Sequence, residues 1–254
     1  MNETYESMNL AKAVFHDVNL AQARFEDVNL SGASIRNANL ENFSIDDAYI
    51  KGMTIFGLDL EKLISDEFDR RDPERVLLRM ADPYDLECVR QVMHHLDEVR
   101  HSFRQTLLAA DATQLSTRPS PREWSVVEVL RHLLYSEDLF LNRRILGNAE
   151  PWNPLGLLPD FLHGDPAYAG VGSQPTENIR LILDAWEGLH TCMRLYIASV
   201  TVEQLHSPLR DLAYGQGKVA DVLRGMPQHD LVHIRQAEAA LRLLQEKGET
   251  SSAS

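Results

Sequence analysis

Two histidines one helical turn apart, His229 and His233, are the residues whose type and spacing point most directly to chemistry. Side chains at positions i and i+4 project from the same helix face, so both imidazoles can reach one ion. A third imidazole from a neighbouring helix would complete a facial set, and His132, far upstream, is the candidate. Three nitrogen ligands leave a coordination position open, which is typical of a reactive metal site rather than a closed structural one.

Three neutral imidazoles would leave a divalent ion with its full charge. Such an ion acidifies bound water towards a pKa of about 7, or binds a thiol as the thiolate. Nitrogen ligands suit zinc, nickel and ferrous iron; zinc is favoured here, with the other two as alternatives. Each ligand ring also needs its second nitrogen anchored, and Glu128, Asp230 and Gln236 lie close enough in sequence to do so. Glu128 can equally serve a helix cap. No residue is assigned as catalytic.

The histidines lie in two of four long amphipathic segments. Apolar residues at spacings of three and four predict helices over 83–112, 125–146, 176–197 and 219–244. Ser125 and Glu128 form a capping box at the start of the second segment. Gly225 and Pro227 should kink or restart the last helix just before His229.

The connection over residues 147–175 is too long and too rich in glycine and proline for a simple link. Long loops of this kind are often lids or walls of functional sites. Four of its side chains could border an apolar substrate cleft: Trp152, Phe161, His163 and Tyr168.

A different pattern occupies the first 64 residues, where apolar residues recur with a period of five. One phase runs from Leu10 to Leu60, and a second apolar or small set lies two residues before each member. Neither a flat strand nor an amphipathic helix has this period. A coil of square cross-section does, if each pentapeptide forms one side with two inward residues.

The A-N-L-x-x pattern resembles the pentapeptide-repeat family, whose members form right-handed quadrilateral β-helices, over about residues 8–64. This resemblance implies a short stack of coils around a buried apolar column. It favours a folding device or a docking surface for a protein partner. DNA mimicry, known in some members, is disfavoured because basic residues such as Lys12, Arg24 and Arg36 interrupt the segment.

The composition excludes several other classes of function. A net charge of -13 and a pI near 5.2 argue against a nucleic-acid partner. No apolar run approaches the roughly 20 residues that span a bilayer, and the polar N-terminus is no secretory signal. Cys88 and Cys192 have no partner spacing and are expected to be free thiols in a reducing cytoplasm.

Two separated motifs carry a second resemblance. S-T-R-P-S-P-R-E-W-S-V-V-E-V-L-R-H-L, followed downstream by H-D-L-V-H-I-R-Q, looks like the DinB/YfiT-like (DinB_2) superfamily of metal-binding four-helix bundles over residues 82–246. The family's three histidine ligands would fall on His132, His229 and His233. Members with known activity are mainly S-transferases that use low-molecular-weight thiols, together with a related isomerase, and hydrolase-like roles are also suggested.

The sequence therefore predicts two domains, a short quadrilateral β-helix and an all-α four-helix bundle of DinB/YfiT type. The expected boundaries are 1–64 for the repeats, 65–82 for a charged linker with a short helix, 83–246 for the bundle and 247–254 for a disordered tail. The favoured function is that of a metal-dependent thiol S-transferase or hydrolase. The alternative is a non-enzymatic scaffold with a structural or vestigial ion.

A small-molecule substrate, with a low-molecular-weight thiol as co-substrate, is the expected partner of the favoured function. A protein partner docked on the repeats and a homodimer are further options. Neither a nucleic acid nor a membrane is expected.

Overall fold

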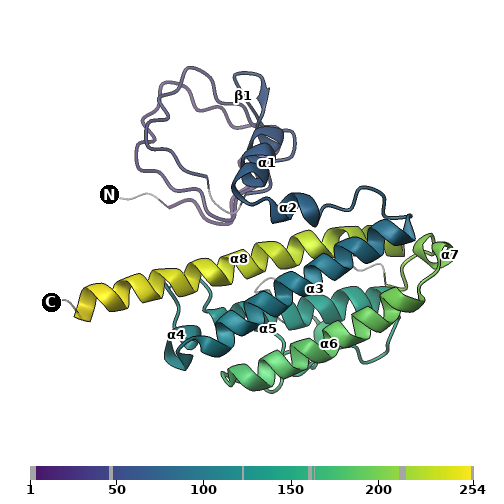
Figure 1. Cartoon of the computed structure of the whole chain (residues 1–254). Helices are drawn as coiled ribbons and strands as arrows, with labels where there is room; N and C mark the ends of the chain where they lie inside the picture. Colours follow the sequence, from purple (N-terminus) through teal and green to yellow (C-terminus); the bar gives the residue numbers. More distant parts are fainter. Residues whose placement is uncertain are drawn as a thin grey trace. The chain divides into compact units, whose positions relative to one another are not determined.

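The computed structural model describes residues 4–45, 48–121, 123–159, 162, 164–211 and 216–252. The chain divides into two compact units, residues 1–49 and 50–254, and each has its own architecture (Figure 1). In the described part of the chain, no helix combines the length and the apolar character needed to cross a membrane.

The first unit is a coil built from regularly spaced turns. The backbone N–H of Ala13 donates to the carbonyl of Leu10 at 2.9 Å, and the same bond recurs ten residues later at Ala23 and again at Ala33. An asparagine precedes each of these leucines, and the side chain of Asn9 accepts a hydrogen bond from the N–H of Ala11 at 3.0 Å. Asparagine supports a turn in this way because its short side chain imitates a backbone carbonyl.

The backbone also has a corner every five residues. A left-handed conformation, with positive φ, recurs at Ser7, Lys12, Asp17, Gln22, Asp27, Gly32, Asn37 and Asn42. These corners alternate between hydrogen-bonded turns and simple bends. The predicted five-residue unit is therefore confirmed for the backbone. Because turns and bends alternate, the same kind of corner recurs every ten residues.

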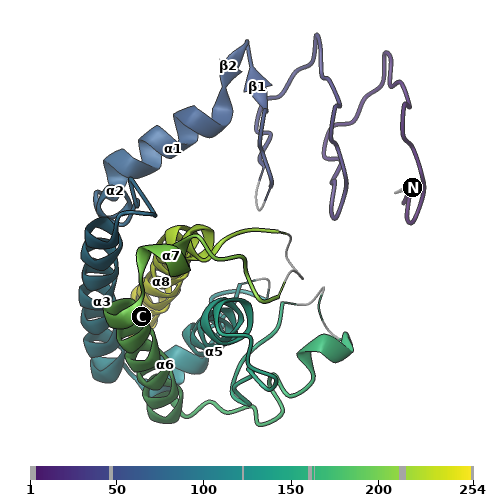
Figure 2. The same cartoon turned by 90° about the vertical axis from the view of Figure 1, so that its right-hand side faces the viewer.

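The apolar column predicted inside this coil is not buried. Leu10, Leu20 and Leu40 are 47–48% exposed, and Phe15 and Ile35 are more exposed still. Residues 4–45 contain no β-strand, and successive coils of this unit stand apart in Figure 2. Pairing along strand ladders is what holds neighbouring backbones about 4.8 Å apart. Without such ladders the coils do not close over their apolar side chains, so the buried stack predicted from the sequence is not observed.

The second unit begins with a hairpin and two short helices. Strand β1 (Thr54–Ile55) pairs antiparallel with β2 (Leu58–Asp59). Helices α1 (Leu60–Arg71) and α2 (Glu74–Leu77) follow. Asp59 caps α1 by accepting a hydrogen bond from the N–H of Lys62. Helix α1 thus begins within the segment that the sequence assigned to the repeats.

Long helices make up the rest of this unit. In chain order they and the shorter elements between them are α3 (Leu86–Ala109), α4 (Ala112–Ser116), α5 (Val126–Glu137), the π-helix η1 (Asp138–Ile145), the 3-10 turn η3 (Pro166–Tyr168), α6 (Ile179–Ser199), α7 (Val202–Leu205) and α8 (Val219–Ser252).

Helices α3, α5, α6 and α8 lie side by side (Figures 1 and 2). Helix α5 packs against α6 and α8, and α3 packs against the same two helices. Each contributes an apolar stripe to one core, with Leu96, Leu130, Trp186 and Ile234 almost completely buried. The predicted capping box at Ser125 is present, and it begins the most deeply buried of these helices.

Two predictions about helix continuity are wrong. Helix α8 runs without a break through Pro227, where a kink or a restart was expected, and it extends to Ser252. Pro227 is buried, and the flanking residues Leu223, Met226 and Leu231 are packed in the core. Burial of that stripe outweighs the local cost of proline, as tertiary packing generally dominates helix stability.

The second helix also departs from expectation. After Glu137 its backbone widens into π-helical turns, and the N–H of Leu146 bonds to the carbonyl of Leu141, five residues back. Such turns are rare and are found most often at functional sites. The spacing of apolar residues in the sequence does not reveal π-helical turns, because such turns rotate the apolar face of the helix by only a fraction of a turn.

The continuity of α8 predicts the effect of replacing Pro227 with alanine. A proline inside a helix costs about 3 kcal/mol relative to alanine, and the loss of two buried methylenes offsets about half of that gain. Pro227→Ala should therefore raise the free energy of unfolding by about 1–2 kcal/mol, measured by urea denaturation. A decrease would contradict continuity, because proline stabilises a helix that begins at its own position.

Candidate metal centre

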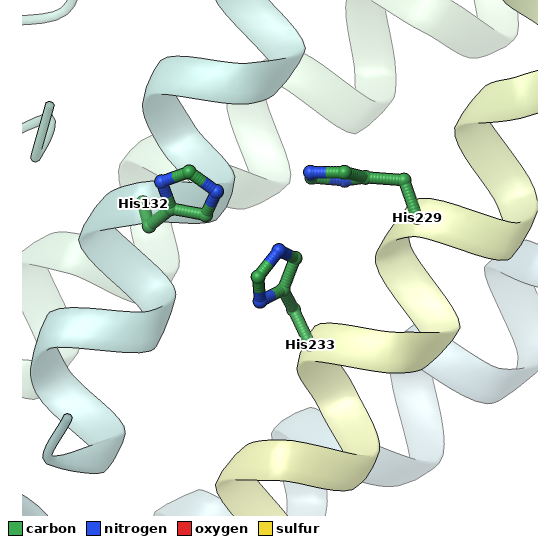
Figure 3. Close-up of side chains that lie close together, drawn as sticks. All are labelled: His132, His229 and His233. Carbon is green, nitrogen blue, oxygen red and sulfur yellow. The ribbon is translucent and has the colours of Figure 1, made fainter. Parts of the chain in front are cut away.

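The three predicted histidines converge between two helices. His132 projects from α5, and His229 and His233 project from successive turns of α8 towards it (Figure 3). One ligand nitrogen from each ring lies within 4.8 Å of the other two. The ring centroids of His233 lie 4.6 Å from those of both His132 and His229.

Each of the three rings has one nitrogen in a hydrogen bond. His229 Nδ1 lies 3.4 Å from Asp230 Oδ1, and His233 Nδ1 lies 2.9 Å from Gln236 Oε1. A carboxylate oxygen and an amide oxygen only accept, so these Nδ1 atoms carry the protons and Nε2 keeps its lone pair. His132 is held the other way round, with Nε2 3.3 Å from the hydroxyl of Ser136.

The donor set suits a metal ion, because three imidazole nitrogens lie within 4.8 Å of one another and imidazole is a common metal ligand. The nitrogen of His132 that faces the other two rings is Nε2 (Figure 3). Nitrogens that share a tetrahedral zinc ion lie 2.0–2.1 Å from it, and therefore about 3.4 Å apart. To hold one ion, the most distant of the three nitrogens would have to approach one another by up to about 1.4 Å.

The surroundings favour the neutral form of His132 and His233, which is the form that binds a metal. Burial lowers the pKa of His132 to about 3, with further lowering by the neighbouring His233 and His229. Burial also lowers the pKa of His233, again with a contribution from His229. In the metal-free protein His132 therefore stays uncharged well below neutral pH.

Aromatic rings that were not predicted to be part of the site surround the three histidines. The ring of Trp124 lies 5.0 Å from that of His132, and Tyr135 lies 5.9 Å from it. Phe140 meets His229 edge to face at 5.3 Å. Tyr135 and Phe140 stand three and eight residues after His132, spacings that place them on the same broad face of α5 and η1. This spacing is the feature of the sequence that could have placed both rings near His132.

A buried ionic network braces α8 beside the triad. Arg100 on α3 is 2% exposed, and its guanidinium contacts both Asp230 on α8 and Glu137 on α5. Glu137 Oε1 also accepts hydrogen bonds at 2.9 Å from Trp186 Nε1 and His190 Nε2, both on α6. All four long helices therefore contribute to one network, which reaches the metal candidates through Asp230.

Burial and neighbouring charged groups determine the protonation of the two acidic residues in this network. Burial raises the pKa of Glu137 to about 8. Burial would also raise the pKa of Asp230, but Arg100 and His229 overcome that effect and hold it far below its usual value. Asp230 therefore carries the negative charge opposite Arg100 at neutral pH. Arg100 and Glu137 are not predictable from the sequence, because a charged residue inside an apolar stripe does not indicate its partner.

Glu128 does not take part in the site. Its carboxylate accepts a hydrogen bond from the N–H of Ser125 at 2.8 Å, completing the capping box, and it pairs with Arg118. Of the three candidate anchors, Asp230 and Gln236 contact the triad and Glu128 caps a helix.

The long connection packs against α5 and η1 near His132. Arg131 donates to the carbonyls of Leu155 and Gly156, and the N–H of Leu157 donates to the carbonyl of Arg131. Asp138, whose pKa burial raises to about 7, accepts from the N–H of Asn153. This segment is therefore fixed to the helix that carries the first metal candidate.

The four residues predicted to border a cleft do not share one environment in the structure. Trp152 and the buried Tyr168 pack with Tyr135 in a small second cluster, so Tyr168 supports the wall rather than lining a cleft. The guanidinium of Arg143 lies 5.1 Å from both rings. Phe161 and His163 lie outside the described residues.

Comparison with known families agrees with both sequence motifs. The model of the DinB superfamily matches residues 95–237, a range that contains all three histidines. The model of pentapeptide repeats matches eight copies over residues 9–45. No curated protein and no solved structure shows significant similarity to the chain.

The buried network predicts a large loss of stability when its cation is removed. Arg100→Met keeps the bulk but leaves the buried Asp230 carboxylate without a countercharge, so the free energy of unfolding should fall by about 3–5 kcal/mol. Arg104→Met, on the same helix, removes the half-exposed pair with Asp184 and should cost less than about 1 kcal/mol. Similar losses in the two variants, measured by urea denaturation, would show that the network is not stabilising.

The lowered pKa of His132 predicts sensitivity to acid in the metal-free protein. Below pH 6.5 the unfolded chain binds a proton at this residue, and the folded protein does not until about pH 3. Stability should therefore fall with decreasing pH across this window by about 1.4 kcal/mol per unit more than in His132→Gln. Denaturation at pH 7 and pH 5 measures the difference, and parallel losses would contradict a neutral buried His132.

Proposed function

The chain belongs to the DinB superfamily, and we propose that it binds one divalent metal ion through His132, His229 and His233 and acts as a metal-dependent thiol S-transferase or hydrolase. One observation carries the proposal: one nitrogen from each of the three imidazoles lies within 4.8 Å of the other two. Zinc is the favoured ion, with nickel and ferrous iron as alternatives, since imidazole suits all three.

The donor set defines the chemistry that an ion would supply. Bound to three neutral ligands, a divalent ion lowers the pKa of a water or thiol in the open position, which yields a nucleophile at neutral pH. None of the three proposed ligands carries a negative charge, so the ligands themselves would leave the charge of the ion intact. Asp230 and Gln236 would fix the orientation of His229 and His233 through their Nδ1 protons.

The surroundings support a reaction in a partly dry site. Trp124, Tyr135 and Phe140 surround the imidazoles with apolar surface, which excludes water and strengthens electrostatic interactions inside the site. The 147–175 segment, fixed to α5 at Arg131, would form one wall of the substrate cleft.

The finer architecture is also proposed. The packing of α3, α5, α6 and α8 supports a four-helix bundle of YfiT type. The five-residue spacing of backbone corners supports a right-handed quadrilateral β-helix as the stacked form of the repeats.

Metal content tests the proposed site. Purified protein should contain about one equivalent of divalent metal per chain by elemental analysis. Replacing all three histidines with alanine should remove it, because no other group of described residues brings three such ligands together. His94→Ala/His101→Ala/His206→Ala is a matched control, since it removes three histidines that lie outside the triad. Unchanged metal in the triad variant would exclude the site.

Thiol conjugation then tests the reaction. Purified protein should transfer low-molecular-weight thiols to electrophiles, and a chelator should abolish the rate while leaving the fold intact by circular dichroism. If metal removal instead lowered the melting temperature strongly and no thiol reacted, the ion would be structural, as in a scaffold protein.

A further inference from the structure

A pocket of about 220 Å³ opens beside α8, one helical turn before His229. The apolar part of its wall comes from Phe140, Leu209, Val222 and Met226. Its polar part comes from Arg144, Gln216 and Asp221. The pocket therefore offers mainly apolar surface, with polar groups for an exposed end.

Two features join this pocket to the metal candidates. Phe140 belongs to both, because its ring lines the pocket and meets the ring of His229 at 5.3 Å. Gly225 also lines the pocket and stands four residues before His229, on the same face of α8. A molecule bound beside His229 could therefore extend along α8 into this space.

Gly225 has no steric reason to be glycine. A Cβ atom added there would meet nothing within 4 Å, and glycine inside a helix costs about 1 kcal/mol relative to alanine. Side chains on a helix lean towards its N-terminus, so a larger residue would extend over Asp221 and Val222, which line the pocket. What glycine provides at this position is open space next to the site.

We propose that this pocket binds the apolar side chain of the small molecule whose reactive group reaches the ion, and that Gly225 determines its allowed size. This inference rests on the proposed metal function. The volume of about 220 Å³ equals about seven water-sized units of about 30 Å³, which accommodates an unbranched alkyl group of up to about six carbons.

The test uses simple alkanethiols as probes of cobalt(II)-substituted protein, with the absorption of the cobalt–thiolate complex as the readout. Each methylene that enters an apolar site contributes about 0.8 kcal/mol, or about fourfold in affinity. Hexanethiol should therefore bind the native protein at least tenfold more tightly than ethanethiol. Octanethiol should gain little more, because the pocket is filled.

Gly225→Leu should remove this dependence on chain length. Ethanethiol should bind the variant within twofold of the native affinity, and hexanethiol should lose most of its tenfold advantage. Gly188→Leu is the matched control, because Gly188 is also helical with open space around an added Cβ but lies on α6, away from the pocket. That variant should retain the full chain-length preference.

The outcomes separate the two proposals. If cobalt does not bind, or ethanethiol gives no thiolate absorption, the proposed function fails and this inference fails with it. If ethanethiol binds normally but longer thiols gain nothing, the proposed function stands and the pocket is not part of the site. An equal preference in Gly225→Leu and native protein would likewise overturn the role of Gly225.

Discussion

The contact between Arg100 and the acidic side chains of Asp230 and Glu137 is the constraint on which the rest of the helical unit depends. Burying a charge is unfavourable unless it is paired, so the network holds together only when α3, α5 and α8 are in register. Asp230 directly follows His229, and the register that satisfies Arg100 therefore also sets the depth of the metal candidates. Stability of the core and geometry of the site are consequences of the same packing.

The site combines two requirements that usually conflict. Metal binding needs polar nitrogens with free lone pairs, whereas a folded core excludes unsatisfied polar atoms. At His229 and His233 the protein reconciles them by engaging Nδ1 with Asp230 and Gln236 and leaving Nε2 directed at the shared space (Figure 3). At His132 the nitrogen that faces this space is also Nε2, and the hydroxyl of Ser136 lies 3.3 Å from it.

Local sequence pattern and tertiary packing contribute differently to the structures of the two units. A five-residue period forces a corner at every fifth residue whether or not the coils stack, because the corner is a local backbone property. Burial of the apolar column needs contact between coils, and that contact is absent from the described repeats. In the helical unit the opposite holds: packing overrides a local signal, and α8 passes through Pro227 because its buried stripe continues on both sides.

The sequence by itself determined the helical segments, the capping box at Ser125, the five-residue corners and the three histidines of the candidate site. These features follow from the spacing of residues within one helix or one coil, and that spacing can be read directly from the sequence. Only the tertiary structure decided that Arg100 faces Asp230, that Phe140 lies against His229 and that Glu128 caps a helix instead of anchoring a ligand. Those contacts join residues on different elements, or choose between two partners of one residue. The free energy that selects them comes from the packing of the whole unit, which no local pattern contains.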